Sequence, residues 1–394
     1  MNGVIRLYTD VAMSTIIRKS LIALLLPAAV AVALLFRLLD ESPPGQDGTT
    51  PLLALAPDPS PSDAAYRFAV IGDYGDNSDA EARVAALVAG WEPDFVVTTG
   101  DNNYPDGGAT TIDRNIGQYY SAFIGNYSGD YGPGSPDNRF WPSPGNHDWH
   151  SIGCSATGCD GPYMQYFTLP GNERYYTADY GLVRLYALDS HDQEPDGTTA
   201  DSAQAAWLRD ALAGSEACFD VVYFHHPPYS SGKHGSREGM RWPFGEWGAD
   251  VVLSGHEHSY ERLDVGGMPY FVNGIGGKSL YPFTHVGELP AGVTSLVRYN
   301  ANYGAMLITA AASGLTAQLF DADGVLIDQY TLDKSCAASP TPTATPEAAT
   351  NTPAATSTPS DTPSPTPTMD RSFYLPIVTG GTGLPRAAHL LQCS

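Results

Sequence analysis

Five short segments of this 394-residue chain concentrate side chains that can bind metals or transfer protons. They are Gly72-Asp73-Tyr74-Gly75, Gly100-Asp101-Asn102-Asn103-Tyr104, Gly145-Asn146-His147-Asp148, His225-His226-Pro227 and Gly255-His256-Glu257-His258. Nine of the ten histidines lie between His147 and His285, in a chain whose acids outnumber its bases 43 to 20. Carboxylates and imidazoles together form a donor set that suits Fe, Mn or Zn. The pattern therefore indicates a metal centre or acid–base chemistry.

The number and kinds of these donors favour two metal ions over one. A single transition metal cannot use all of them, whereas two ions about 3.5–4 Å apart that share one carboxylate can. A phenol such as that of Tyr104 has an ordinary pKa of about 10 and binds readily only a strongly Lewis-acidic ion, which favours trivalent iron. Two such ions can activate a hydroxide for in-line attack on a phosphoryl group. His147 and His234 are the candidates for giving the leaving alkoxide its proton.

Four apolar segments must bring these side chains together. Residues 67–71, 94–98, 220–224 and 250–253 are short and apolar on both faces, as the buried strands of an α/β sheet are. Each is followed closely by one of the polar segments. Ligands of open α/β sheets bind beyond the carboxyl ends of the strands, so donors that are far apart in the sequence can converge on one site.

Helices and a β-rich end complete the predicted α/β fold. A capping box at Ser78 begins a helix that runs to about Gly90, and Ser202 begins a second helix. Near the end of the folded part, residues 305–309 and a hairpin around residues 321–324 predict antiparallel strands.

The two ends of the chain differ in composition from its middle. The predicted segments are a targeting segment at 1–41, a Pro-rich linker at 42–64, a catalytic domain at 65–334, a Thr/Pro-rich linker at 335–370 and a short tail at 371–394. Arg18 and Lys19 precede an apolar run from Leu21 to Phe36, whose length lies between that of a signal peptide and that of a membrane span. We therefore expect export, with either a cleaved signal peptide or an N-terminal anchor that associates with the membrane.

Charge and cysteine content bear on the partners and the compartment. The formal net charge of −23 repels polyanions, so we expect no nucleic-acid partner. Cys154 could pair with Cys159, and Cys218 with Cys336, which leaves Cys393. None of the five cysteines forms a C-x-x-C pair, so we do not expect a thiolate zinc site. An export signal would be compatible with disulfides.

The five polar segments, in this order, resemble those of the metallophosphoesterases of the calcineurin-like superfamily. Tyr104 in the second segment makes the chain similar to the purple acid phosphatases of the small, single-domain kind. The resemblance implies a fold of two packed mixed β-sheets flanked by helices. It also implies an Fe(III) site formed by Asp73, Asp101, Tyr104 and His258. The implied site for the divalent ion is formed by Asp101, Asn146, His225 and His256, with Asp101 bridging the two ions.

The resemblance also implies roles for residues around the metals. His147 and His234 would lie over the phosphate, and Asp148, the neighbour of His147, is a further candidate catalytic residue. The tandem pair His225-His226 leaves open which histidine is the ligand, and alignment of the motif favours His225.

Together these residues predict an exported acid phosphatase that hydrolyses small phosphate monoesters with Fe(III) and a divalent Fe, Zn or Mn ion. Two alternatives stay open. One is a phosphodiesterase or nucleotide-hydrolysing enzyme that uses the same two-metal site. The other is an inactive surface-display protein, which the Thr/Pro-rich segment motivates. The sequence does not specify the oligomeric state.

Overall fold

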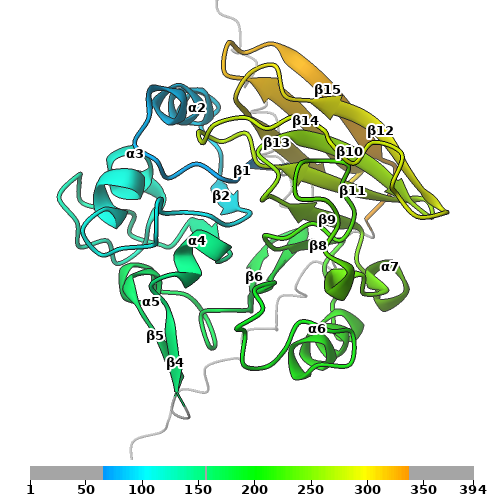
Figure 1. Cartoon of the computed structure of the whole chain (residues 1–394), viewed down its shortest axis with the longest axis horizontal. Coiled ribbons are helices and arrows are strands. Elements are labelled where there is room, and N and C mark those ends of the chain that lie inside the picture. Colours follow the sequence, from blue (N-terminus) through cyan, green and yellow to red (C-terminus); the bar gives the residue numbers. More distant parts are fainter. Residues whose placement is uncertain (1–64, 156–157, 337–394) are drawn as a thin grey trace, which may run out of the picture. The chain divides into compact units, whose positions relative to one another are not determined.

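The computed structural model of this chain describes residues 65–155 and 158–336 (Figure 1). The predicted segments at 1–41, 42–64 and 371–394, and the Thr/Pro-rich linker beyond residue 336, lie outside the described residues. The described residues all belong to the first of two units into which the chain divides, Met1–Ser339 and Pro340–Ser394. Within the described part, no helix combines the length and the apolar character needed to cross a bilayer.

A six-stranded mixed sheet contains the first two predicted strands. Its order is β15 (Leu326–Leu332), β14 (Gly314–Asp321), β13 (Gly304–Ala311), β1 (Tyr66–Ile71), β2 (Phe95–Thr98) and β3 (Phe140–Pro142). Strands β1, β2 and β3 are parallel, while β13 pairs antiparallel with β1 and continues into the predicted hairpin of β14 and β15.

A seven-stranded mixed sheet contains the other two predicted strands. Its order is β12 (Val293–Tyr299), β10 (Tyr260–Val265), β11 (Met268–Asn273), β9 (Val251–Ser254), β8 (Phe219–Tyr223), β7 (Val183–Ala187) and β6 (Tyr176–Tyr180). Its centre, from β11 through β9 and β8 to β7, is parallel. The outer strands β12, β10 and β6 are paired antiparallel.

The alternation of side chains along β8 shows how the layers pack. Val221 and Tyr223 lie in a core that also contains β1 and β2 side chains of the six-stranded sheet. Val222 points to the opposite face, where a second core contains residues of α6 (Ala203–Ala213) and α7 (Phe244–Trp247). Because successive strand residues face opposite sides, one apolar strand serves two cores. The two sheets therefore pack face to face with helices outside, as predicted.

The predicted helices begin at the expected caps. Helix α2 (Asp79–Gly90) starts at Ser78, whose side chain accepts the backbone N–H of Glu81, and it packs against the six-stranded sheet. Helix α6 starts at Ser202 in the same way and ends at Gly214. The remaining short elements are η2 (Asp113–Gly117), α3 (Gln118–Tyr120), η3 (Ser121–Phe123), α4 (Asn146–Trp149), α5 (Pro162–Tyr166), η4 (Glu238–Met240) and the ribbon of β4 (Gly153–Ser155) with β5 (Gly158–Asp160).

Both predicted cysteine pairs are disulfides. Cys154–Cys159 links β4 to β5, and Cys218–Cys336 ties the chain after β15 to the start of β8. The second bond joins positions 118 residues apart and so fixes the end of the six-stranded sheet to the seven-stranded sheet.

Candidate metal centre

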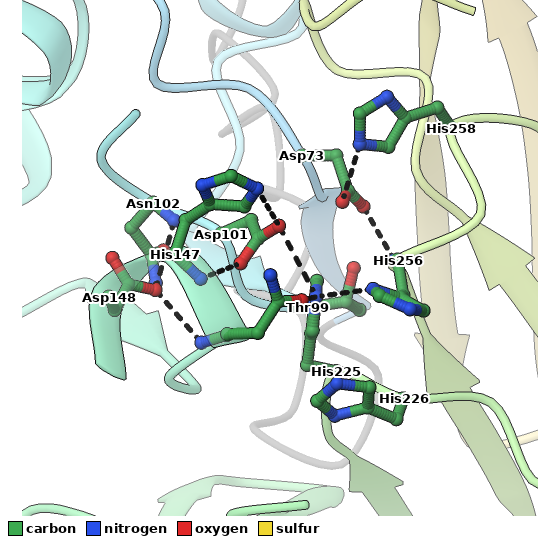
Figure 2. Close-up of polar contacts among 12 residues, drawn as sticks. Asp73, Thr99, Asp101, Asn102, His147, Asp148, His225, His226, His256 and His258 are labelled. Carbon is green, nitrogen blue, oxygen red and sulfur yellow. Dashed lines mark hydrogen bonds and ion pairs between the residues drawn. The ribbon is translucent and has the colours of Figure 1, made fainter. Parts of the chain in front are cut away.

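The predicted ligands meet where strands of both sheets end (Figure 2). Asp73 follows β1 and Asp101 follows β2, while His225 follows β8 and His256 and His258 follow β9. Although these strands belong to two sheets, their carboxyl ends point to one place, as ligand sites of α/β folds require.

One group of donors surrounds the phenol of Tyr104. Its oxygen lies 3.0 Å from Asp101 Oδ2, 3.3 Å from Asp73 Oδ1 and 3.0 Å from His258 Nε2. His258 Nε2 also lies 3.3 Å from Asp73 Oδ1. These are the four residues that the resemblance assigns to Fe(III), and all four are buried.

A second group surrounds His225 Nε2. This nitrogen lies 3.0 Å from Asn146 Oδ1, 3.1 Å from His256 Nδ1 and 3.4 Å from Asp101 Oδ2. Asp101 Oδ2 therefore faces both groups, in the position that a bridging carboxylate would occupy. The residues predicted for the divalent ion thus converge as a set.

The structure distinguishes the two tandem histidines. His226 Nδ1 lies 2.9 Å from Ser190 Oγ, and the backbone N–H of His226 donates to the same hydroxyl. His225 instead contacts both Asn146 and Asp101, so the geometry favours His225 as the ligand. His226 remains close, since its ring centre lies 4.5 Å from that of His256.

Backbone carbonyls orient two of the imidazoles. His225 Nδ1 lies 2.9 Å from the Thr99 carbonyl oxygen, and His258 Nδ1 lies 2.7 Å from that of Ser279. A neutral ring that donates from Nδ1 presents its Nε2 lone pair on the other side, which is the arrangement that metal-binding histidines use. In both rings Nε2 is the nitrogen that faces the carboxylates, Asp101 for His225 and Asp73 for His258.

The backbone at the predicted ligands is unusual. Asp73, Asp101, His256 and His258 have φ angles of 53°, 52°, 71° and 40°, in the left-handed region that non-glycine residues rarely adopt. Gly100, which precedes Asp101, also has a positive φ, of 92°. Gly145 serves a different purpose, because a Cβ there would collide with Asp101 Oδ1. Strain of this kind is concentrated at functional sites in proteins.

The charges at the centre are strongly coupled. Burial favours a raised pKa for Asp101, but the adjacent His225 and His147 outweigh it and hold the pKa well below its usual range. Burial opposes the charged form of His225, yet Asp101 raises the pKa of this imidazole to about 9. Burial, followed by Asp101 and Asp73, raises the pKa of Tyr104 well above its ordinary value. A phenolate at this position therefore needs a compensating cation, which a trivalent ion would supply.

The three candidate catalytic residues occupy different places. His147 donates its backbone N–H to Asp101 Oδ1 at 2.8 Å, and its ring centre lies 4.3 Å from that of Tyr104. His234 lies at the exposed rim, with its ring centre 4.4 Å from that of His256. Either imidazole could contact a ligand bound at the candidate metal centre.

Asp148 lies behind the cluster, so we assign it a positioning role. Its Oδ2 accepts the backbone N–H groups of Gly145 and Asn102 at 2.8 and 3.1 Å and the Asn102 amide at 2.9 Å. Burial, and secondarily Asp101, raises its pKa to about 6. The buried carboxyl group joins the second and third polar segments.

Two contributors are absent from the sequence prediction. Tyr281 stacks on His258 with ring centres 4.1 Å apart and planes 7° apart. Glu257, which separates the two histidines of its segment, accepts the backbone N–H of His234 at 2.9 Å through Oε2. The spacing of Glu257 between two ligands could have drawn attention to it, whereas nothing marks Tyr281 among 23 tyrosines.

Comparison with known proteins relates the sequence of this chain to a family of phosphoesterases. Residues 66–260 match the family model of the calcineurin-like phosphoesterases. Purple acid phosphatase 17 of Arabidopsis thaliana is 26% identical over 250 residues, which cover 56% of this chain and 71% of that protein. The probable inactive purple acid phosphatase 1 of the same plant is 24% identical over 247 residues, covering 52% and 39%.

A solved structure shows the likeness of fold. GAP50, the anchor in the inner membrane complex of Plasmodium, superposes with a TM-score of 0.52 at 17% identity, covering 69% of this chain and 89% of that one. The predicted resemblance and the predicted fold class are thereby confirmed.

Proposed function

Because residues 66–260 of this chain match the calcineurin-like phosphoesterase family model, we propose that the protein is an exported acid phosphatase that hydrolyses small phosphate monoesters. The observation that carries the proposal is the position of Asp101 Oδ2, which faces a tyrosine–histidine group on one side and an amide–histidine group on the other. Two different sets of donors around one carboxylate suit two different metal ions.

The residues present suit Fe(III) and a divalent Fe, Zn or Mn ion. Asp73, Tyr104 and His258 would hold Fe(III), and Asn146, His225 and His256 would hold the divalent ion, with Asp101 shared. When bound, such a pair of ions makes water nucleophilic and neutralises negative charge on a phosphoryl group.

The chain's own side chains would do the remaining work. His147 is held by Asp101 through its backbone, and its Nδ1 faces the Pro105 carbonyl oxygen, while its Nε2 lies 3.9 Å from Asp101 Oδ2. His234 lies on the rim beside His256. From these positions the two imidazoles bind phosphoryl oxygens and give a proton to the leaving alkoxide.

Spectroscopy and metal analysis test the proposal. Purified protein should contain two metal ions per chain and show a visible tyrosinate-to-iron absorption band. Tyr104→Phe should remove the band, whereas Tyr131→Phe, at a tyrosine that is 42% exposed, should keep it. The protein should also hydrolyse a nitrophenyl monoester faster at acidic than at neutral pH. An unchanged band in Tyr104→Phe, or faster turnover of the nitrophenyl bis-ester, would contradict the proposed ligand or the proposed substrate class.

The names of one relative and of one structural neighbour favour a competing function, that of a binding protein without catalytic activity. One relative is labelled probably inactive, and the structural neighbour is described as an anchor. A binding protein on this scaffold would have lost its metals, and metal content near zero after growth with iron and zinc would establish it. The complete set of seven predicted ligands supports the enzyme instead.

The proposal of export has support outside the metal centre. Two disulfides form among the described residues, and disulfides persist mainly in oxidising compartments. The basic and apolar pattern of residues 1–41 agrees with this. Recovery of the protein from the medium or the cell envelope, against the cytosol, would test it.

A further inference from the structure

A cation lies over the aromatic ring of one predicted iron ligand. The ammonium of Lys278 is 4.7 Å from the centre of the Tyr104 ring. This is within the distance of about 6 Å at which a cation and an aromatic ring attract each other. The phenol oxygen of Tyr104 instead faces Asp101, Asp73 and His258. Lys278 therefore acts on the ring, while the oxygen is left to the other predicted ligands.

Lys278 is held at both its backbone and its ammonium. Its backbone N–H donates to the carbonyl oxygen of Asp73, a predicted ligand, at 2.9 Å. Its ammonium lies 2.8 Å from Asp76 Oδ1. Asp76 is held in turn, because the buried Glu81 accepts its backbone N–H at 3.1 Å. Charges that are anchored in this way act on their surroundings without a cost of reorganisation.

The surroundings of the Tyr104 ring keep the charge of Lys278 effective. Tyr104 is 2% exposed, and the side chain of Lys278 is 28% exposed. Water and salt screen a partly buried charge much less than an exposed one. Asp76 has the opposite charge and offsets part of the effect of Lys278. The two residues therefore act on the ring with opposite signs.

From these contacts we propose that the Lys278–Asp76 pair tunes the electronic properties of Tyr104 and of the iron that it binds. The inference rests on the proposed function, because it requires Tyr104 to bind Fe(III). A positive charge beside a phenolate ring stabilises its electrons, so more energy is needed to move one of them to iron. The same charge favours Fe(II) over Fe(III), because Fe(II) has the smaller positive charge. Lys278 therefore raises both the energy of the absorption band and the reduction potential, and Asp76 lowers both.

Visible spectra of the full iron-loaded chain test the proposal. Lys278→Met removes the charge and keeps an unbranched side chain, so the tyrosinate-to-iron band should move to longer wavelength. Asp76→Asn removes the opposing charge, so the band should move to shorter wavelength. Lys278→Arg keeps the charge and should leave the band near its original position. Opposite shifts in the first two variants distinguish an electrostatic effect from a general disturbance of the site.

A redox titration of the same variants gives a second measurement. One electron from an added reductant converts Fe(III) to Fe(II), and loss of the band follows the reaction. In Lys278→Met the equilibrium constant for this reduction should fall about tenfold, which lowers the potential by about 59 mV. In Asp76→Asn the equilibrium constant should rise.

Lys334→Met is the matched control. Lys334 also pairs with an aspartate, at 2.7 Å, and its ammonium lies 5.9 Å from the centre of the Phe219 ring, which is not a predicted ligand. This variant should keep the band and the potential. An unchanged band and potential in Lys278→Met, or shifts of the same sign in Lys278→Met and Asp76→Asn, would overturn the proposal.

Failure of this proposal and failure of the proposed function give different results. If the unmodified iron-loaded protein lacks the band, Tyr104 is not an iron ligand and the tuning role of Lys278 is overturned with it. A band that shifts as expected in a protein without phosphatase activity would support the role of Lys278 and contradict the proposed function alone.

Discussion

Two clusters of buried acids follow the carboxyl ends of strands, one cluster in each of the two sheets, and they differ in what balances their charge. The metal centre contains Asp73 and Asp101. The second cluster follows β7 and contains Asp189 and Glu194, which are also buried. Asp189 ends an apolar run just as the predicted ligands do, yet the resemblance leaves no ligand role for it.

The second cluster contains an arginine that pairs with its acids, whereas a cation beside the metal centre, Lys278, lies 4.7 Å from the centre of the Tyr104 ring and pairs with Asp76. Arg174 binds both oxygens of Glu194, at 2.8 and 3.1 Å, and lies 2.7 Å from Asp196. Asp189 accepts hydrogen bonds from the Trp149 indole and from a backbone N–H. In contrast, no arginine or lysine among the described residues forms an ion pair with Asp73 or Asp101, whose ionic neighbours are imidazoles.

The presence or absence of an arginine partner distinguishes an acid cluster that supports the fold from one that is suited to binding metals. Buried charges must be paired or coordinated to be tolerated. The acids beside Arg174 are satisfied by the chain itself, whereas those beside Tyr104 are balanced only in part by histidines that are themselves candidate ligands. Acids at strand ends are therefore informative mainly when the chain supplies no arginine or lysine to neutralise them.

The largest effect should follow from removing the shared carboxylate. Asp101→Asn deprives both groups of donors of their common charge, so we expect both metal ions to be lost and kcat to fall by at least about a hundredfold. Metal analysis and initial rates measure this. Asp189→Asn is the matched control and should retain both ions. Equal metal loss in the two variants would remove the distinction between the clusters.

The next largest effect should be a loss of stability in Arg174→Met, with metal binding and activity retained. This change leaves Glu194 buried without its partner, and breaking a buried ion pair costs about 3–5 kcal/mol. Urea unfolding measures the free energy of unfolding, and metal content per folded chain should stay normal. Arg184→Met, at a more exposed pair with Asp179, should cost less than about 1 kcal/mol. Similar losses in both variants would show that burial of the Arg174 pair is unimportant.

The strands and the motifs could be predicted locally, but their division between sheets could not. Residues 67–71 and 250–253 have the same apolar character, yet β1 belongs to the six-stranded sheet and β9 to the seven-stranded one. The choice depends on pairing with distant strands, such as β1 with β13, and a short apolar segment carries no information about its partner.

The predicted ligands converge, but the residues that orient them could not be predicted from the sequence. Ser279 and Thr99 act through backbone carbonyls, which every residue type possesses. Tyr281 acts through a ring stack that depends on the path of the chain after β11. Side-chain donors are visible in a sequence because their types are distinctive; backbone acceptors and packing partners are not.

The pH dependence of stability should have opposite signs for the two clusters. Burial, and then Glu194, raises the pKa of Asp189 well above its usual range, so its stabilising contribution is present below about pH 4 and is lost as the pH rises. The lowered pKa of Asp101 makes its contribution present above about pH 4 and lost as the pH falls. Each group alters the free energy of unfolding by at most about 1.4 kcal/mol per pH unit.

Denaturant unfolding of metal-free protein across the pH range tests this. Asp189→Asn should flatten the decline in stability at higher pH, and Asp101→Asn should flatten the decline on the acidic side. If Asp189→Asn left the slope at higher pH unaltered, the carboxyl group would be ionised in the folded protein, and the contrast between the clusters would fail.

The smallest effect should come from a single hydrogen bond between α4 and the second cluster. Trp149 lies on α4, the helix that begins at Asn146, and its indole N–H donates to Asp189 Oδ2 at 2.8 Å. Trp149→Phe keeps an aromatic ring but removes the donor, which should cost about 1–3 kcal/mol of stability because a buried oxygen of the Asp189 carboxyl group loses its partner. A shift of α4 would also move Asn146, so the divalent ion should bind severalfold more weakly while the iron band is retained. Trp207→Phe, in α6, controls for the change of side chain. A loss of stability with unaltered affinity for the divalent ion would mean that the second cluster supports the fold alone and does not position the metal centre.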